Sequence, residues 1–294
     1  MVKNGFFTSS IALIKSRKEI AFVVTWTTAL ATIISGKGIP PITQSFLSII
    51  ATFMIVMSVY IYNDVIDREM DAYSEQEKKK TRPIAHGKVS ETNAMRFVYL
   101  TGLIGLGLSL MLSRIVFNIA LTYCFFMFLY SHPSVRFKSR YIIKTIVSCL
   151  LLPTAFLIGG AAVENTISTT MLFLAFAWYA LSFLVSPSIA DMLDAEEDLA
   201  FNIKTIGNTL SWKQNLILYN IGIIVLIASS AISFLLYDIS FFVPIITSVA
   251  GITLMAFSYK LRNENGLTAS HKLRPVSSIL LMLNPLLLAL GAVF

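Results

Sequence analysis

Residues 42–71 read ITQSFLSIIATFMIVMSVYIYNDVIDREMD, a long and predominantly apolar run that leads into a group of carboxylates. A hydrocarbon core about 30 Å thick requires roughly 20 apolar residues in helical conformation. The apolar part, 42–62, therefore predicts a membrane-spanning helix. The part that follows contains Asp64, Asp67 and Asp71 in the spacing D-x-x-D-x-x-x-D. The stretch thus predicts a helix that crosses a bilayer and carries acidic side chains at one end.

Apolar runs of similar length recur along the whole chain. Of its 294 residues, 56% are hydrophobic and only 13% are charged, whereas soluble domains carry about 25% charged residues. The predicted spans cover residues 20–35, 42–62, 95–112, 116–130, 141–163, 167–189, 215–237, 240–259 and 276–294. We therefore expect an all-α membrane protein with nine transmembrane helices in a single bundle. Residues 20–294 would form this membrane domain.

The charged residues are distributed unequally between the two sides of such a bundle. With nine spans, all but Lys37 and Arg114 of the 23 lysines and arginines lie on one side, as do all but Glu164 and Asp238 of the 16 acidic residues. Basic loops stay in the cytoplasm. The N-terminus is therefore predicted to be cytoplasmic and the C-terminus outside, in a multi-pass protein of the cell membrane. The formal net charge of +7 belongs to the cytoplasmic side.

The segment before the first span, residues 1–19, is polar and amphipathic. Its apolar side chains Phe6, Phe7, Ile11 and Ile14 could lie on the membrane surface as one face of an interfacial helix. A solvated N-terminal segment is the alternative.

The acidic spacing of 64–71 occurs a second time, at the end of the sixth predicted span. There Asp191, Asp194 and Asp198 repeat D-x-x-D-x-x-x-D. Below, Asp64, Asp67 and Asp71 are the first motif and this second set is the second motif. On a helix, positions i, i+3 and i+7 lie within about 60° of one another, so each motif would present three carboxylates on one face. Two such helices would frame a cytoplasmic-side active-site cavity.

Six carboxylates in one cavity require cations. Hard oxygen ligands of this kind suit Mg²⁺, which prefers one or two carboxylates together with phosphate oxygens. The alternative is that these are solvated helix ends with acidic residues scattered by chance. Nucleic-acid binding is not expected, because the carboxylates would repel phosphates and no known binding module is visible.

Basic residues follow both motifs and predict a diphosphate ligand. Each motif is followed by Lys-Thr, Lys80-Thr81 and Lys204-Thr205, and Arg82 comes directly before a proline. Arginine and lysine can neutralise the negative charge of a diphosphate that metal ions do not balance. We expect Arg82 and Lys204 to serve in this way, whereas Lys78 and Lys79 are attributed to the basic bias of cytoplasmic loops.

Together these residues resemble the UbiA superfamily of intramembrane prenyltransferases over nearly the whole chain. Asn63 with the first motif looks like the family's N-D-x-x-D-x-x-x-D. The segment from Arg82-Pro83 to Gly87-x-Val89-Ser90 looks like its R-P-x-x-x-G-x-[IV]-S continuation, and the second motif with Thr205 looks like the family's second motif. The family commonly has Gly where this chain has Glu197 and Asn202, so the backbone after the second motif is expected to differ.

The resemblance implies roles for individual residues. The six motif aspartates would hold Mg²⁺, and Asn63 would contact substrate. Tyr130 would face the reacting allylic group, with a belt aromatic at the membrane interface as the alternative. The segment after the fourth span and the first helix would help to bind diphosphate through Ser131, Arg136, Lys138 and Arg17.

The implied activity is transfer of a polyprenyl group from a prenyl diphosphate to a lipophilic acceptor through an allylic cation. The acceptor could be a geranylgeranylglyceryl phosphate-type lipid, which we favour, or an aromatic quinone precursor. A membrane transporter that uses surface carboxylates is the alternative from another class. The sequence does not specify an oligomeric state.

Overall fold

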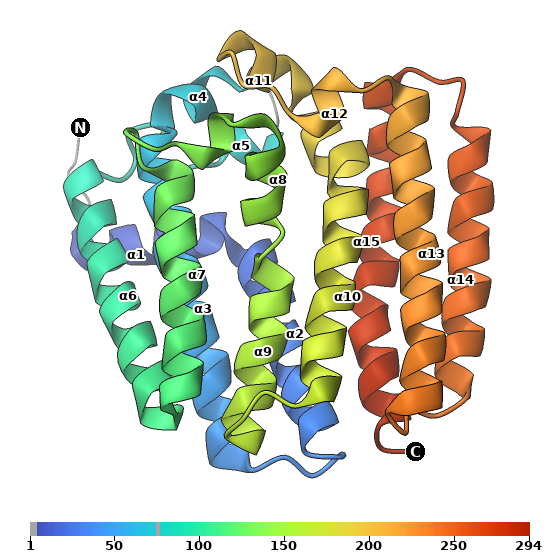
Figure 1. Ribbon diagram of the computed structural model, residues 1–294. Helices are drawn as coiled ribbons and strands as arrows, with labels where there is room; N and C mark the ends of the chain where they lie inside the picture. The colour runs from blue at the N-terminus through green and yellow to red at the C-terminus, as the bar shows by residue number, and fades with distance from the viewer. Residues whose placement is uncertain (1–4, 75–76) are drawn as a thin grey trace.

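The computed structural model describes residues 5–74 and 77–294, and these residues form a bundle of helices without strands. The long helices run side by side, and short helices cover one end of the bundle (Figure 1). The helices of the apolar spans are α2 (Lys18–Ser35), α3 (Ile42–Ile66), α6 (Glu91–Leu112), α7 (Arg114–Ser131), α8 (Tyr141–Ser148), α9 (Leu151–Glu164), α10 (Thr169–Ser186), α13 (Trp212–Leu236), α14 (Phe242–Lys260) and α15 (Gly266–Gly291). The other elements are α1 (Phe6–Ser16), α4 (Arg68–Tyr73), α5 (Glu77–Lys80), η1 (Phe137–Ser139), η2 (Pro187–Asp191), α11 (Ala195–Ala200) and α12 (Ile206–Thr209).

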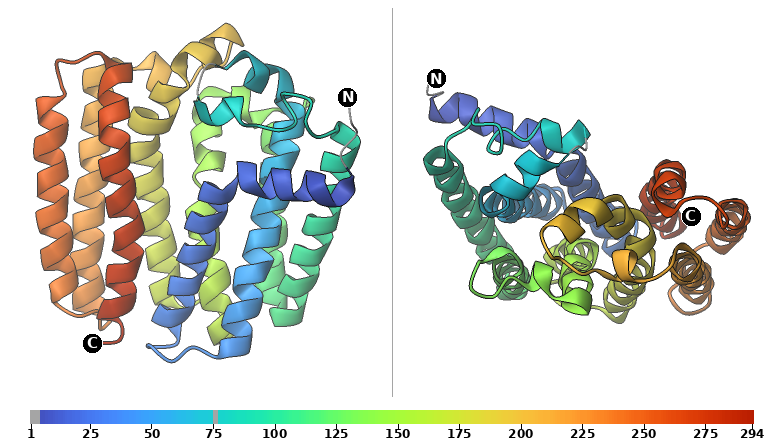
Figure 2. Two further views of the ribbon diagram at one scale, coloured as in Figure 1. Left: turned by 180° about the vertical axis from the view of Figure 1, so that it is seen from behind. Right: turned by 90° about the horizontal axis from the view of Figure 1, so that it is seen from above.

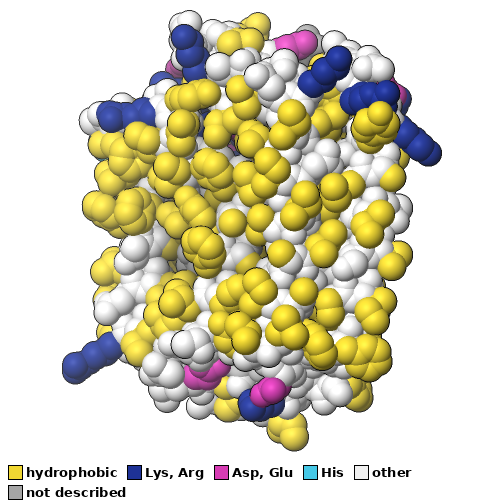
Figure 3. All heavy atoms as spheres, turned by 45° about the vertical axis from the view of Figure 1, so that its right-hand side comes forward, with side chains coloured by type: hydrophobic (Ala, Val, Ile, Leu, Met, Phe, Trp, Pro, Cys, Tyr) yellow, Lys and Arg dark blue, Asp and Glu magenta, His cyan; other side chains and the backbone are white. Residues whose placement is uncertain are grey.

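Nine segments in the described part of the chain are long and apolar enough to cross a membrane, which confirms the predicted number. The fifth joins α8 to α9, and the sixth joins α10 to η2. Hydrophobic side chains cover the middle of the face shown in Figure 3, and Lys and Arg side chains lie mainly toward one end. This distribution is what a bilayer requires, because exposed charges are costly in its core.

Several helices begin earlier than predicted, because polar residues start them. The ninth span begins at Gly266 rather than 276, and the Asn265 side chain caps it by accepting hydrogen bonds from the backbone N–H groups of Leu267 and Thr268. Ser90 and Ser211 cap α6 and α13 in the same way. Hydrophobicity alone does not detect these first turns, whose stability comes from capping side chains.

The third and fourth spans form a hairpin with only Ser113 between them. This residue is extended, with φ −169° and ψ 162°, and its side chain accepts a hydrogen bond from the Val116 N–H at the start of α7. The hairpin is therefore tighter than the predicted connection over 112–117.

The interior contains three groups of buried apolar side chains. One lies among α10, α13, α14 and α15, another joins α3, α7 and α9, and the third lies where α1, α3 and α6 meet. Helices α2 and α9 approach closely at Gly159, where an added Cβ would lie 2.5 Å from the Thr28 carbonyl oxygen. Helices α3 and α10, whose C-terminal ends lead into the two motifs, are thereby held in one bundle through α2 and α9.

Helix α1 lies across the bundle instead of along it (Figure 2). Leu13 is fully buried in the third group, whereas Phe7 on another face is 78% exposed. The C-terminus lies at the end of the bundle opposite the short helices.

Candidate active site

The two motifs lie at helix junctions. Helix α3 ends at Ile66 and α4 begins at Arg68, so Asp67 joins them with φ −94° and ψ 11°. Asp194 precedes α11 with φ −94° and ψ 1°. The expectation that each motif lies on one uninterrupted helix is wrong. Asp and Asn side chains compete for backbone and neighbouring groups and disfavour helix interiors, and here the Asn63 amide donates a 2.7 Å hydrogen bond to Asp67 Oδ2.

Backbone hydrogen bonds nevertheless cross both junctions. The Asp71 N–H donates to the Asp67 carbonyl at 2.8 Å, and the Asp198 N–H donates to the Asp194 carbonyl at 2.8 Å. Each junction is therefore a distortion within a continuing helical path.

Each motif aspartate is paired with a basic side chain. Arg17 forms an ion pair with Asp64, and its Nε lies 2.9 Å from Asp64 Oδ2. In the first motif, Arg82 also pairs with Asp71, and Lys138 pairs with Asp67.

The second motif is paired by two lysines. Lys144 Nζ lies 2.8 Å from Asp198 Oδ2 and 3.2 Å from Asp191 Oδ1. Lys79 Nζ lies 3.2 Å from Asp194 Oδ1. Asp194 is the most accessible of the six aspartates, with 32% of its side chain exposed, whereas Asp191 and Asp198 are buried.

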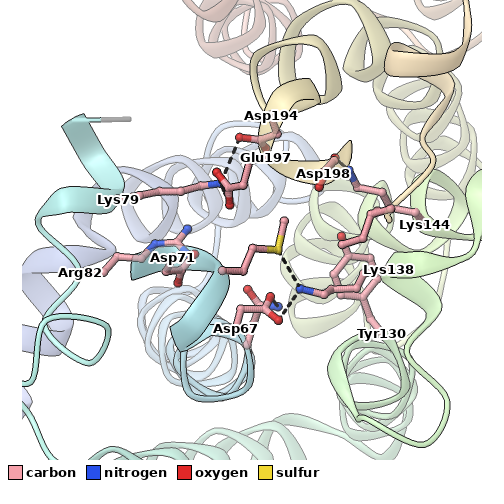
Figure 4. A pocket seen from close by; sticks show the side chains of 13 residues that line it. Asp67, Asp71, Lys79, Arg82, Tyr130, Lys138, Lys144, Asp194, Glu197 and Asp198 are labelled. Carbon is pink, nitrogen blue, oxygen red and sulfur yellow. Dashed lines mark hydrogen bonds and ion pairs between the residues drawn. The ribbon is translucent and has the colours of Figure 1, made fainter. Parts of the chain in front are cut away.

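These charged side chains surround one cavity of about 120 Å³ (Figure 4). Residues from both motifs face it, and Tyr130 lies beside Lys138 and Lys144. The lining consists of Asn63, Asp67, Met70, Asp71, Lys79, Arg82, Tyr130, Lys138, Lys144, Asp194, Glu197, Asp198 and Ile203. The cavity lies under the short helices at one end of the bundle, so residues up to 140 positions apart in sequence meet there.

Asp64, Asp191, Arg17 and Ser131 support this cavity from behind its lining. Asp64 is 1% exposed and joins Arg17 to Arg82, whose Nη1 lies 3.4 Å from Asp64 Oδ1. The buried Ser131 hydroxyl accepts a 3.0 Å hydrogen bond from the Asn63 amide. The guanidinium of Arg17 also lies 5.2 Å from the centre of the Tyr60 ring.

Besides Arg17 and Ser131, two further predicted substrate-binding residues, Lys204 and Arg136, lie outside the lining. Lys204 is exposed, and the Thr205 side chain that follows it caps α12 by accepting from the Asn208 N–H. Arg136 has a left-handed backbone, with φ 44°, at the start of η1, and its neighbour Lys138 is the residue that reaches Asp67. The turn thus directs only one of these two basic side chains to the motifs.

Sequence reasoning missed three site residues, Lys79, Lys144 and Glu197. Lys79 is 7% exposed and pairs with Glu197, so it is not a solvated loop lysine. Lys144 carried a recognisable signal, because it is a lone ionisable residue inside a predicted span and such residues generally have functional partners. Nothing in the sequence signalled the partnership of Lys79 and Glu197, which are 118 positions apart.

Burial affects the ionisation of the cavity residues. It raises the pKa of the Asp198 carboxyl to about 6, although Lys144 acts in the opposite direction. Burial also raises the pKa of Asp71 against the effect of Arg82, and it lowers the pKa of Lys138 against the effect of Asp67. These charged groups have lost much of their hydration, so a charged ligand would interact with them strongly.

The donor set fits a hard divalent cation bound together with an anionic ligand. Asp71 Oδ2 and Asp191 Oδ2 are buried and have no hydrogen-bond partner among the described residues. In the same part of the chain, no three His, Cys, Asp or Glu side chains converge closely enough to hold an ion by themselves. Mg²⁺ commonly takes one or two carboxylates and completes its shell with water and phosphate oxygens, so the arrangement suits it.

Comparison with known proteins agrees with this geometry. A model of the UbiA prenyltransferase family matches residues 24–284. A 4-hydroxybenzoate octaprenyltransferase of Shewanella woodyi is 32% identical over 95 residues, about a third of each chain. A digeranylgeranylglyceryl phosphate synthase of Natronomonas pharaonis is 25% identical over 248 residues, which cover 83% of this chain and 86% of the relative.

Solved structures share the fold. A structure described as a digeranylgeranylglyceryl phosphate synthase has a TM-score of 0.78 at 19% identity and covers 98% of this chain and 99% of its own. A UbiA homolog from Archaeoglobus fulgidus bound to DMAPP and Mg²⁺ has a TM-score of 0.71 at 15% identity, with 97% of this chain and 99% of the homolog covered.

Proposed function

Because the chain belongs to the UbiA prenyltransferase family, we propose that it transfers a polyprenyl group from a prenyl diphosphate to a lipophilic acceptor. One observation carries this proposal above the others: four aspartates from the two repeated motifs and four basic side chains line a single cavity at one end of a membrane bundle. A diphosphate needs both kinds of group, since metal ions bridge its oxygens and basic side chains take the remaining charge.

In the proposed reaction, the bond between the allylic carbon and the diphosphate oxygen breaks. The diphosphate leaves with the electron pair, and an allylic cation forms. The acceptor then supplies an electron pair to this carbon and loses a proton. Mg²⁺, held by the six motif aspartates, would neutralise charge on the leaving diphosphate when bound.

The chain's own residues supply binding and protection. Arg82, Lys138 and Lys144 already face the cavity and would contact diphosphate oxygens. The face of the Tyr130 ring would stabilise the cation, an effect of about 0.5–2 kcal/mol. The helices around the cavity would exclude water, which would otherwise consume the cation. Arg17 would hold Asp64 in place through their buried ion pair.

For the acceptor, we propose a geranylgeranylglyceryl phosphate-type lipid. The match with a synthase for such a lipid extends over 83% of this chain, whereas the match with the Shewanella woodyi octaprenyltransferase, at 32% identity, covers 95 residues. That higher local identity makes an aromatic acceptor the second candidate. The position of the carboxylates at one end of the bundle argues against a transporter, whose ion sites lie near the bilayer midplane.

We further propose that the motif end of the bundle faces the cytoplasm and that the protein resides in the cell membrane. The support is the excess of Lys and Arg in the loops on this side. Residues 1–19 would then lie at the cytoplasmic interface, with α1 across the bundle and Phe7 toward lipid. Residues 20–294 would form one prenyltransferase membrane domain.

A direct assay tests the function and the acceptor together. The purified protein is incubated with Mg²⁺ and geranylgeranyl diphosphate, and with either geranylgeranylglyceryl phosphate or 4-hydroxybenzoate. We expect a prenylated lipid and release of diphosphate. Prenylation of 4-hydroxybenzoate alone would replace the lipid acceptor by the aromatic one. Failure to prenylate either acceptor would contradict the proposal, provided that a thermal unfolding transition shows the protein to be folded.

A further inference from the structure

The ion pair between Lys79 and Glu197 is a contact at the cavity that involves none of the six motif aspartates. Lys79 Nζ lies 2.7 Å from both carboxylate oxygens of Glu197 and 3.2 Å from Asp194 Oδ1. Both Lys79 and Glu197 are less than a tenth exposed, and both line the cavity (Figure 4). Glu197 belongs to neither motif, although it directly precedes Asp198.

This pair connects the segment after the first motif with the segment that carries the second. Lys79 lies in α5, after the first motif, and Glu197 lies in α11, between Asp194 and Asp198 in the sequence. The same two regions also meet through Tyr73 and Phe201, whose rings lie 5.7 Å apart edge to face. Stability alone is a weak reason for such a pair, because the cost of burying two charges commonly cancels their attraction.

The side chain of Lys79 is suited to exchange one anion for another. Its ammonium group lies on a flexible four-carbon stem and has three donors that can rotate. Lys79 is bound more closely to Glu197 than to the motif residue Asp194. When Lys79 moves toward an anion in the cavity, the main contact that it gives up is therefore the one with Glu197 and not the one with a motif aspartate.

We infer that Lys79 binds the diphosphate of the donor. Glu197 is a positioning residue that pairs with Lys79 in the donor-free protein and releases it when the donor binds. This inference rests on the proposed function only for the identity of the donor. In the donor-free protein, Glu197 neutralises Lys79 and keeps it beside the cavity. When the diphosphate enters, its oxygens compete with Glu197 for the ammonium group. Donor affinity then reflects the difference between the two interactions.

Substitution of Lys79 and substitution of Glu197 should have opposite effects on donor affinity. K79M should raise the KM for geranylgeranyl diphosphate and the Kd for inorganic pyrophosphate measured with Mg²⁺ by about tenfold, as expected for a lost charged hydrogen bond. E197Q should lower both values by about threefold, because Lys79 no longer has to be released. Neither variant should change the KM for the acceptor. A purely structural pair would instead raise the values in both variants.

The double variant separates release of Lys79 from a general change in cavity charge. Removing Glu197 should have no effect on pyrophosphate affinity in the K79M background, so K79M/E197Q should bind like K79M. A general charge effect would persist in that background and would overturn the inference, as would unchanged affinity in K79M. If K79M alone does not fold, comparison of K79M/E197Q with E197Q gives the same information, since the double variant leaves neither charge unpaired.

A second ion pair provides the matched control. Lys272 and Glu264 are also separated by 2.8 Å, but Lys272 is 51% exposed and neither residue lines the cavity. K272M should leave pyrophosphate affinity unchanged. Pyrophosphate binding by the wild-type protein without any prenyl transfer would contradict the proposed function and leave this inference standing. Normal prenyl transfer by the wild-type protein, together with unaltered donor affinity in K79M, would contradict this inference and leave the proposed function standing.

Discussion

Asp67 and Asp194 occupy corresponding places in the structure: each is the middle aspartate of a D-x-x-D-x-x-x-D motif, and each joins two helical segments with φ −94°. Through these junctions the first motif passes from α3 into α4, and the second passes from η2 into α11. The chain therefore builds its cavity from two similar bends that face each other. Both bends depend on helical hydrogen bonds that continue across them.

Removal of one motif carboxylate tests its role without large changes in shape. We expect D64N and D191N each to lower kcat by more than tenfold, which corresponds to about 1.4 kcal/mol of barrier per factor of ten. They should also raise the Mg²⁺ concentration that gives half-maximal transfer. Steady-state assays over a range of Mg²⁺ measure both effects. Full turnover by both folded variants would eliminate the assigned role of the motifs.

Lys144 should be important for stability as well as for activity. K144M leaves Asp191 and Asp198 buried without their basic partner, and such a loss typically costs about 3–5 kcal/mol. K272M breaks a pair of similar length that is largely exposed, where the cost is about 1 kcal/mol or less. Unfolding in detergent should therefore rank K144M well below K272M. Equal stabilities would show that burial does not control the strength of these pairs.

The aromatic face of Tyr130, rather than its hydroxyl, should matter for the chemical step. Y130F keeps the ring and should retain most of kcat, whereas Y130L should lose about two- to thirtyfold, equivalent to 0.5–2 kcal/mol. Single-turnover transfer from geranylgeranyl diphosphate measures this step. A large loss in Y130F together with a small additional loss in Y130L would assign the role to the hydroxyl instead.

Gly207 should control the position of Asp191. A Cβ at this residue would lie 2.4 Å from the Pro187 carbonyl oxygen and 2.5 Å from Asp191 Cβ, so G207A must displace the second motif. We expect a loss of transfer activity of about tenfold or more, since small misplacements at a reacting centre can cost up to about a hundredfold.

A second glycine gives the control for this substitution. Gly107 lies in α6, and a Cβ there would meet nothing within 4 Å. G107A should keep full activity and gain up to about 1 kcal/mol of stability from higher helix propensity. Equal activity of G207A and G107A would contradict the predicted displacement of Asp191.

Removal of divalent metal should stop transfer without unfolding the protein. Every motif aspartate already has a basic partner in the described structure, so most of the negative charge of the motifs is balanced without metal. EDTA should abolish activity while the thermal unfolding midpoint stays within about 2 °C, a shift of about 1 kcal/mol. Added Mg²⁺ should restore activity. Unfolding in EDTA would mean that metal holds the two motifs together.

The sequence alone determined the number of spans, their approximate places and the two motifs. These features are local: a run of apolar residues has one low-energy solution in a bilayer, a helix that satisfies its own backbone, and the carboxylate spacing can be read directly from the chain. The first turns of α6, α13 and α15 were missed, because capping depends on the geometry of single side chains.

Only the tertiary structure decided which cations meet which carboxylates. Lys138 reaches Asp67 while the nearby Arg136 does not line the cavity, and Lys79 is buried against Glu197 while Lys204 is exposed. All four are basic residues in loops of one side, so composition and charge bias treat them alike. Whether each of them reaches the cavity depends on the bend of each junction and on the packing of helices that are distant in sequence. These features set the direction of a side chain, and sequence spacing does not specify them.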